Sequence, residues 1–194
     1  MNPKILLSIS FVLMSLLTTG AAETPVTIAD FDSSAPTNNL GGSSGTFSGE
    51  KPDNSCQITK SLTERRGVGG ASLQVDFNVG EGGCYNGFWL KLGADEAAFD
   101  ASKYKKITFW IKGKAEPGIP SEIKFELKSG PDKSGVVYFG EINSEWKKVE
   151  FALKEFSDQG IDLSHLIDIF MVFEQRKAIP ATQGTIFVDD FRFE

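Results

Sequence analysis

Histidine and cysteine are scarce in this sequence of 194 residues, which contains one His and two Cys. A zinc site takes about four closely spaced ligands, and His165 stands far along the chain from Cys56 and Cys84. No Ser-His-Asp arrangement can be argued from a single histidine, and neither a Walker loop nor a dinucleotide-binding fingerprint is present. The sequence therefore offers no recognisable catalytic constellation, and it favours a binding role over an enzymatic one.

Basic residues are also in the minority, because 20 Lys and Arg stand against 26 Asp and Glu and the formal net charge is −6. Binding to nucleic acid depends largely on the neutralisation of phosphates by a basic surface. The basic pairs of this chain, such as Arg65-Arg66 and Lys147-Lys148, are scattered and have acids nearby. We therefore expect no nucleic-acid partner.

Long apolar runs are missing from the later part of the chain, so we expect no membrane-spanning segment there, since one takes about 20 apolar residues. The start is different, because Lys4 precedes a short apolar run over residues 5–17 and small residues end the segment. This order is typical of a secretory signal peptide, although a retained membrane anchor is the alternative. We predict a signal peptide over residues 1–22 and one exported domain, secreted or periplasmic, over residues 23–194.

Both cysteines lie in the part of the chain that is predicted to be exported. In an oxidising compartment two cysteines without others favour a disulfide, so Cys56 and Cys84 are predicted to form a bridge. The bridge would close a loop of about 28 residues and, in the chain-entropy model, would stabilise the fold by about 3–4 kcal/mol. A free thiol is the alternative.

Period-two alternation of apolar and polar residues dominates the exported part and predicts β-strands. The clearest run lies in residues 122–128, where Ile123, Phe125 and Leu127 alternate with charged residues. The predicted strands cover residues 26–31, 72–79, 87–92, 106–112, 122–128, 135–142, 146–153, 168–174 and 185–193.

Gly-rich and Asn-rich turns separate these strands, which is the pattern of antiparallel sandwiches and jelly rolls. Single turns of helix are predicted at residues 95–99 and 163–167, the second capped by Ser164 or Asp162. The Gly/Ser-rich segment 33–55 is expected to wrap the surface as a loop. The predicted fold class is therefore all-β, a two-sheet antiparallel β-sandwich in one domain.

Three parts of the chain carry a family resemblance. They read ADFD and NNLGGSSGTF (29–32 and 38–47), FDASKYKKITFWIKG (99–113) and GTIFVDDFRF (184–193). This set resembles the galactose-binding-like jelly rolls, especially carbohydrate-binding module family 11, and also the complex I intermediate-associated protein family. The resemblance implies a jelly roll whose first and last strands are neighbours.

The resemblance also implies a structural calcium ion where the first and last strands run side by side. Calcium takes six to eight oxygen ligands, and here Asp30 and Asp32 lie on the first strand and Asp190 on the last. Simple alternation places Asp190 on the apolar face of its strand, where an unpaired charge is costly. We therefore expect these three aspartates to hold calcium, while pairing of Asp190 with Arg192 or Lys60 is the alternative.

Sugar rings stack on aromatic side chains, so aromatic residues that point away from the core are the candidate ligand site. Alternation places Tyr85, Trp89 and Lys91 together on one outward face, and it also turns Tyr138 outward. A second small core under a loop is the alternative for these residues, and for Trp110 packing is the favoured interpretation. We predict that Tyr85, Trp89, Lys91 and Tyr138 bind a polysaccharide or an oligosaccharide.

Three functions stay open at this point. The first is an exported, non-catalytic protein of the carbohydrate-binding module type with a calcium site. The second is an assembly or interaction protein of the complex I intermediate-associated type, whose exposed aromatic residues would bind a protein partner. The third is a jelly-roll glycan lyase or hydrolase, but the acids Glu122 and Glu126 alternate with lysines, as on a solvated face.

Overall fold

The computed structural model describes residues 23–35, 37–49, 51, 54–80 and 82–194. The predicted signal peptide over residues 1–22 lies outside the described residues. Among the described residues, no helix is long and apolar enough to cross a membrane.

Strands make up most of the described chain, and the helices are short. The elements are β1 (Val26–Ala29), β2 (Ser44–Ser48), β3 (Asn54–Ser61), β4 (Ser72–Val79), β5 (Tyr85–Lys91), η1 (Ala94–Glu96), β6 (Lys106–Gly113), β7 (Glu122–Gly130), β8 (Lys133–Gly140), β9 (Lys147–Ala152), α1 (Leu153–Ser157), η2 (Leu163–His165), β10 (Asp168–Glu174), α2 (Gln175–Ala178) and β11 (Gln183–Phe193).

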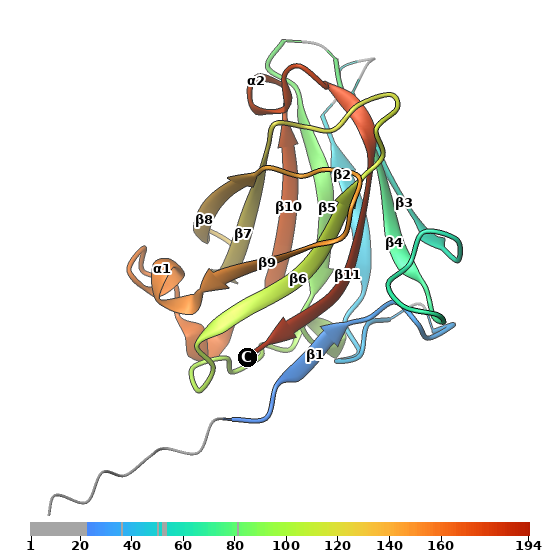
Figure 1. Ribbon diagram of the computed structural model, residues 1–194. Helices are drawn as coiled ribbons and strands as arrows, with labels where there is room; N and C mark the ends of the chain where they lie inside the picture. Colours follow the sequence, from blue (N-terminus) through green and yellow to red (C-terminus); the bar gives the residue numbers. More distant parts are fainter. Residues whose placement is uncertain (1–22, 36, 50, 52–53, 81) are drawn as a thin grey trace, which may run out of the picture.

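The strands form two sheets that pack face to face (Figure 1). Sheet A has the order β3-β4-β11-β6-β9, with β1 paired to β11 as its sixth strand. Sheet B has the order β2-β5-β10-β7-β8. The pairings are antiparallel, and many of them join strands that are distant in the sequence, as in jelly rolls. The predicted two-sheet antiparallel β-sandwich is confirmed.

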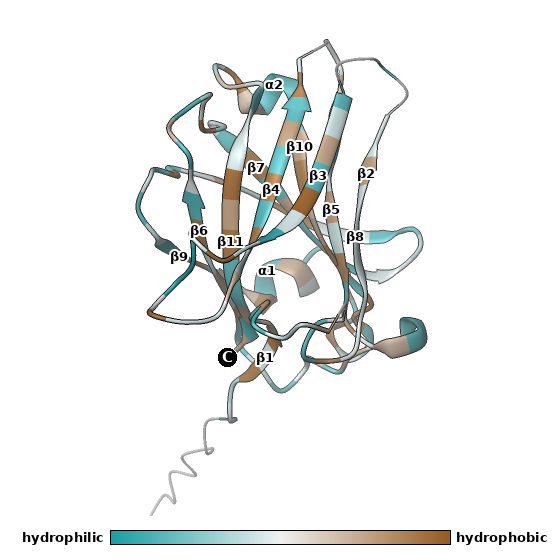
Figure 2. Ribbon diagram, turned by 90° about the vertical axis from the view of Figure 1, so that its right-hand side faces the viewer, coloured by the Kyte–Doolittle hydropathy of each residue, from teal (hydrophilic) through white to brown (hydrophobic). Residues whose placement is uncertain are grey.

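Alternation explains why these segments become half-buried strands. In β7, Ile123, Phe125 and Leu127 are fully buried, while the residues between them are partly exposed. Successive side chains of a strand point to opposite faces of the sheet, so each sheet buries one face against the other. Figure 2 shows this alternation as brown and teal bands along the strands.

Phenylalanine rings fill the centre of the core. Phe109 is fully buried, and its ring centroid lies 5.5 Å from that of Phe125 and 4.9 Å from that of Phe191. Phe139 and Phe151 lie 5.6 and 6.0 Å from it. Aromatic pairs at such distances contribute about 0.5–1.5 kcal/mol each beyond the burial of apolar area. These contacts tie together β6, β7, β8, β9 and β11, and thus both sheets.

The segment 33–55 is not only a surface loop, and that prediction is wrong. It contains β2, an edge strand of sheet B, and the first residues of β3. β2 was hidden because its residues are mostly Gly, Ser and Thr, with Phe47 as its one large side chain. The predicted helical turns are present as η1 and η2, and the side chain of Asp162 caps η2 by accepting a hydrogen bond from Ser164. The short helices α1 and α2 were not predicted.

The predicted disulfide is not found, because Cys56 and Cys84 are both buried free thiols in the structure. Burial raises the pKa of Cys56 to about 12, and the charge of Asp76 adds to the shift. Since the thiolate is the reactive form of cysteine, Cys56 stays protonated and packs as a small apolar side chain.

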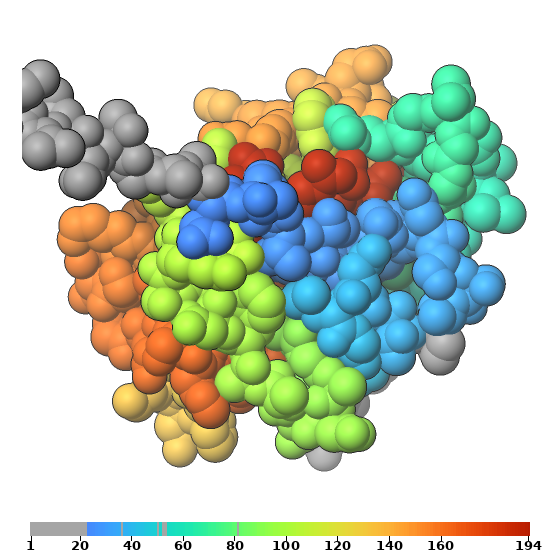
Figure 3. All heavy atoms as spheres, turned by 90° about the horizontal axis from the view of Figure 1, so that it is seen from below, coloured from blue at the N-terminus to red at the C-terminus, as the bar shows by residue number. Residues whose placement is uncertain are grey.

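The first and last strands are neighbours, as the resemblance implied, with Val26 of β1 opposite Phe193 of β11. Figure 3 shows this end of the sandwich from below, with the blue N-terminal segment beside the red C-terminal strand. The pairing of β11 with β6 is interrupted between Asp189 and Arg192. Asp190, inside this bulge, has a positive φ of 52°.

Candidate functional site

The outer face of sheet B carries aromatic and charged side chains in cross-strand rows, because alternate residues of each strand point outward. We call this surface the platform, and its residues are Phe47, Tyr85, Trp89, Lys91, Lys124, Glu126, Lys128, Tyr138, Asp168, Phe170 and Glu174. Of the predicted ligand residues, three lie together on β5, and Tyr138 lies on β8, three strands away. The fold therefore places all four on one face, but only those on β5 lie side by side.

Two glycines make room for two aromatic rings from neighbouring strands on the outer face of sheet B. Gly45 of β2 stands opposite Trp89, and a Cβ atom at Gly45 would come within 2.5 Å of Trp89 Cζ2. Gly87 of β5 stands opposite Phe47, and a Cβ atom there would lie 2.0 Å from the Met171 carbonyl oxygen of β10 and 3.0 Å from Phe47 Cζ. The Trp89 ring therefore lies close to β2 at Gly45, and the Phe47 ring close to β5 at Gly87. Sugar rings stack on aromatic rings of this kind when they lie on an open sheet face.

The aromatic side chains gather on the half of the platform formed by β2, β5 and β10. The ring of Phe47 lies 6.5 Å from that of Tyr85 and 5.7 Å from that of Phe170. Tyr85 is 56% exposed. The ammonium group of Lys128 lies 4.2 Å from the centroid of the Phe170 ring, a cation–π contact. This half is an apolar surface with polar groups at its margin.

The other half of the platform, on β7 and β8, is charged. The Lys124 ammonium lies 3.0 Å from the Glu126 carboxylate and 2.9 Å from that of Glu174. Burial alone would lower the pKa of Lys124, but these two carboxylates outweigh burial and raise it. The Tyr138 hydroxyl donates to Glu174 at 3.1 Å, and Lys177 of α2 lies 4.7 Å from the centroid of the Tyr138 ring. These side chains hold one another in fixed positions and present hydroxyl, ammonium and carboxylate groups.

Sequence reasoning missed Phe47, Lys124, Asp168 and Phe170. The alternation rule that identified Trp89 could have identified Phe170, which alternates with buried residues along β10. Phe47 lay in the segment that was assigned to a loop. Nothing local marks Lys124 or Asp168 as part of the same surface, because only the strand order brings them there.

The predicted calcium ligands do not form one donor set. The Asp30 carboxylate accepts hydrogen bonds from the Asn39 amide at 2.9 Å and from the Asp32 N–H at 3.2 Å. The Asp32 carboxylate accepts from the Ala71 N–H at 2.8 Å. In the described part of the chain, no group of three or more His, Cys, Asp and Glu side chains is arranged to hold a metal ion.

Asp190 is held by arginines. Its carboxylate pairs with Arg66 at 2.9 Å and with Arg192 at 2.8 Å, and the second pair is the alternative that the sequence had left open. The guanidinium of Arg66 also lies 4.1 Å from the ring centre of Trp110, which agrees with a packing role for that tryptophan. A calcium ion would have to displace both arginines, so this donor set does not fit calcium as it stands.

Asp190 was predicted to lie on the apolar face of the last strand, and the bulge in β11 makes this prediction wrong. An inserted residue breaks simple alternation, so Val188 and Phe191 both face the core, and Asp189 is the more buried aspartate, with 4% of its surface exposed. Burial is the main cause that raises the pKa of Asp189 to about 7, and the charge of Asp190 adds to it. Hydrogen bonds from the N–H groups of Asp190 and Arg66 act in the opposite direction.

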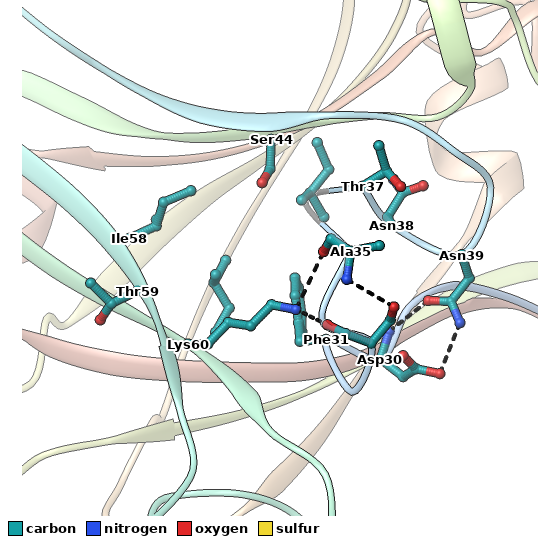
Figure 4. Close-up of a pocket in the computed structure, with 13 residues that line it drawn as sticks. Asp30, Phe31, Ala35, Thr37, Asn38, Asn39, Ser44, Ile58, Thr59 and Lys60 are labelled. Atoms are coloured by element: carbon teal, nitrogen blue, oxygen red, sulfur yellow. Dashed lines mark hydrogen bonds between the residues drawn. The ribbon is translucent and has the colours of Figure 1, made fainter.

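A pocket opens at the edge of the sandwich where β2 of sheet B and β3 of sheet A lie, beside the segment that follows β1 (Figure 4). Ile58 and Leu90 are among its apolar residues, and Asp30 lies at its rim. The Lys60 side chain crosses the pocket and donates to the carbonyl groups of Ser33 and Ala35. None of the platform's aromatic residues lines this pocket. Lys60 therefore serves to hold the segment after β1 in place.

A two-sheet β-sandwich that carries aromatic rings and a hydrogen-bonded charged network on one sheet face is what the class of carbohydrate-binding module-like proteins requires. The family comparison gives the same class. The family model described as carbohydrate binding domain 30 matches residues 31–194. The chain therefore belongs to the family of carbohydrate-binding domain 30.

Solved structures share the fold at low sequence identity. A family 11 carbohydrate-binding module from Clostridium thermocellum, in complex with a β-1,3-1,4-mixed-linked tetrasaccharide, has a TM-score of 0.62 and 20% identity, over 87% of this chain and 94% of that one. A family 30 module of a cellulosomal cellulase of Clostridium thermocellum has a TM-score of 0.60 and 16% identity, over 89% and 98% of the two chains. No curated protein matches the chain. The comparisons do not show the resemblance to the complex I intermediate-associated family.

Proposed function

We propose that this protein is an exported, non-catalytic module that holds an oligosaccharide or a polysaccharide chain on the platform. The observation that carries the proposal is the group of aromatic rings on the outer face of sheet B, in which Trp89 and Phe47 lie close to Gly45 and Gly87 of the neighbouring strands. Small-molecule sites combine apolar and aromatic walls with a few fixed polar groups that set orientation. The platform has both parts, with the rings on one half and the charged network on the other.

The charges of the platform favour a neutral glycan. Lys91 lies 3.2 Å from the buried carboxylate of Asp168, and Lys124 lies between the carboxylates of Glu126 and Glu174. These ammonium groups are already paired, so an acidic sugar would have to compete with carboxylates for them. A neutral sugar can instead donate its hydroxyl groups to the carboxylates and accept from the lysines.

The width of sheet B suits a short stretch of glycan. Neighbouring strands lie about 4.8 Å apart, so the five strands of sheet B span about 19 Å. A chain that crosses the strands would pass from the β2 and β5 side, with Trp89, to Tyr138 on β8. Because the similar family 11 module was solved with a β-1,3-1,4-mixed-linked tetrasaccharide, that tetrasaccharide is the first ligand to test.

Isothermal titration calorimetry with this tetrasaccharide tests the proposal. We expect Trp89→Ala to weaken binding at least about tenfold, which corresponds to 1.4 kcal/mol. Trp146→Ala is the matched control, because Trp146 directly precedes β9 at the edge of sheet A, and it should bind like the parent protein. No heat of binding with this ligand, cello-oligosaccharides, β-mannan and agarose fragments would contradict the proposal, as would equal binding by Trp89→Ala.

Export is part of the proposal and is supported by the pattern of residues 1–22. Expression of the full chain followed by N-terminal sequencing of the protein recovered outside the cytoplasm tests it. Removal of the first 21 or 22 residues is expected. A product that starts at Met1 and stays with the cells would contradict export.

The structural calcium ion stays a prediction, since it rests on the resemblance and since Arg66 and Arg192 already pair with Asp190. Thermal unfolding with and without a chelator separates the possibilities. A melting temperature that falls with EDTA and returns with added calcium would support the ion. An unchanged melting temperature would speak against it.

A further inference from the structure

A buried carboxylate at the end of the platform where β10 begins has one ion-pair partner, Lys91. Asp168 has only 5% of its surface exposed, although it lies on the outer face of sheet B, opposite Lys91 and Lys128. Its Oδ1 atom lies 3.2 Å from the Lys91 ammonium. Within the described residues, however, no group donates a hydrogen bond of good geometry to that oxygen. Buried polar atoms are nearly always hydrogen-bonded, so a carboxylate that relies on this one ion pair can accept further hydrogen bonds.

The surroundings of Asp168 are those of a sugar-reading group. Lys91 is two residues from Trp89 along β5, and its ammonium lies 5.8 Å from the Trp89 ring. Phe170 follows Asp168 on the same face of β10 and stands opposite Trp89. A carboxylate, an ammonium group and an indole ring are thus neighbours at one end of the aromatic half of the platform.

We propose that Asp168 is a specificity-determining residue, which accepts hydrogen bonds from hydroxyl groups of the sugar unit that stacks on Trp89, while Lys91 donates to an oxygen of the same unit. This inference rests on the proposed function and extends it to the recognition of hydroxyl configuration. A carboxylate can accept from two adjacent hydroxyl groups at once, so it distinguishes sugars in which one of them is missing or turned to the other side of the ring.

A purely structural role as counter-ion of Lys91 explains less. Lys91 already has a second carboxylate at 3.4 Å, that of Glu96, whose side chain is 79% exposed. An exposed acid supplies the charge without the desolvation that burial of Asp168 entails. The buried position of Asp168 is therefore better explained by a ligand that completes its hydrogen bonds.

The test compares Asp168→Asn with the parent protein by calorimetry against tetrasaccharides of β-1,4-linked glucose, mannose and xylose, together with the mixed-linked tetrasaccharide. In each sugar unit, mannose differs from glucose in the configuration of one hydroxyl group and xylose lacks the hydroxymethyl group, whereas the mixed-linked tetrasaccharide differs from the β-1,4-linked glucose chain in linkage. We expect the tightest ligand to lose about 10- to 100-fold in affinity, since hydrogen bonds to charged groups are the strong ones, and we expect the preference among the four sugars to shrink. Glu96→Gln, which removes the exposed partner of Lys91, is the matched control and should keep affinity within about twofold.

Each result decides the matter. Trp89→Ala is measured beside Asp168→Asn and tests the platform itself. If Trp89→Ala loses binding while Asp168→Asn keeps both the affinity and the preference among the sugars, the inference is overturned and the proposed function stands. Equal losses in Glu96→Gln and Asp168→Asn also overturn it, because then only the charge around Lys91 matters. Absence of binding to every sugar in the parent protein refutes the proposed function itself. A thermal melt of each variant ensures that the folded protein is compared, and Asp168→Ser provides a second, smaller replacement if Asp168→Asn unfolds.

Discussion

The close approach of the Trp89 ring to β2 depends on the missing side chain at Gly45, and this dependence can be tested by adding one methyl group. In Gly45→Ala the new Cβ would lie 2.5 Å from Trp89 Cζ2 and 2.9 Å from Cε2. Carbon atoms in contact prefer about 3.5–4.0 Å, so the indole must move by about 1 Å or tilt away from β2.

We expect the variant to bind the mixed-linked tetrasaccharide about 3- to 30-fold more weakly, which corresponds to about 0.7–2 kcal/mol. Its stability should change little, because Trp89 is only partly buried and can move outward. Calorimetry measures the affinity, and the change in intrinsic fluorescence between Gly45→Ala and the parent protein reports the new environment of Trp89, since Trp110 and Trp146 contribute to both. Gly130→Ala is the control, since a Cβ atom at Gly130 meets nothing within 4 Å. Undiminished affinity in Gly45→Ala would refute the view that the Trp89 ring binds the sugar in its present position beside Gly45.

Three further predictions concern stability. Gly70 has φ +79°, and a Cβ atom there would lie 1.9 Å from Asp32 Oδ1. Gly70→Ala should therefore destabilise the folded protein by more than the ~1–2 kcal/mol that a left-handed backbone alone costs. Gly69→Ala is the control, because a Cβ atom at Gly69 meets nothing within 4 Å, and urea unfolding measures the stability of both variants. Phe109→Ala should cost about 3–5 kcal/mol and lower the melting temperature by about 6–20 °C, and a shift below 3 °C would contradict its central place in the core. Burial raises the pKa of Asp189 from 3.8 to about 7, so between these pH values the folded protein binds a proton that the unfolded protein releases, and its stability should fall as the pH rises. Asp189→Asn should remove this fall and should have a higher melting temperature than the parent protein at pH 8. A gain of stability between pH 4 and 7 that is lost in Asp189→Asn would contradict the prediction.

Most strands could be predicted because alternation is a local property of the sequence. It located β4, β5, β7 and β10 closely, and it turned Tyr85, Trp89 and Tyr138 outward, as the structure has them. The same rule missed β2, because a strand of small residues at a sheet edge carries almost no apolar alternation. Its small residues make sense only beside β5, where Gly45 makes room for the Trp89 ring.

Two other features lie beyond local patterns. A bulge adds one residue to a strand without any mark in the sequence, and this is why Asp190 was expected on the wrong face and Asp189 was overlooked. The makeup of the platform depends on strand order, because β5, β10 and β7 are neighbours in sheet B although they are far apart in the chain. Asp168 could therefore not be placed beside Trp89 before the topology was known. Whether the predicted ligand residues bind sugar stays a prediction for the experiments above.

The pairing of β1 with β11 places the two ends of the described domain one strand spacing apart at one corner of sheet A, whereas the platform is on the outer face of sheet B. A dye, a surface anchor or a second protein attached to either end would therefore project from the same corner and leave the platform uncovered. In practical terms, the domain can be tethered by either end as a glycan probe with little effect on its recognition surface.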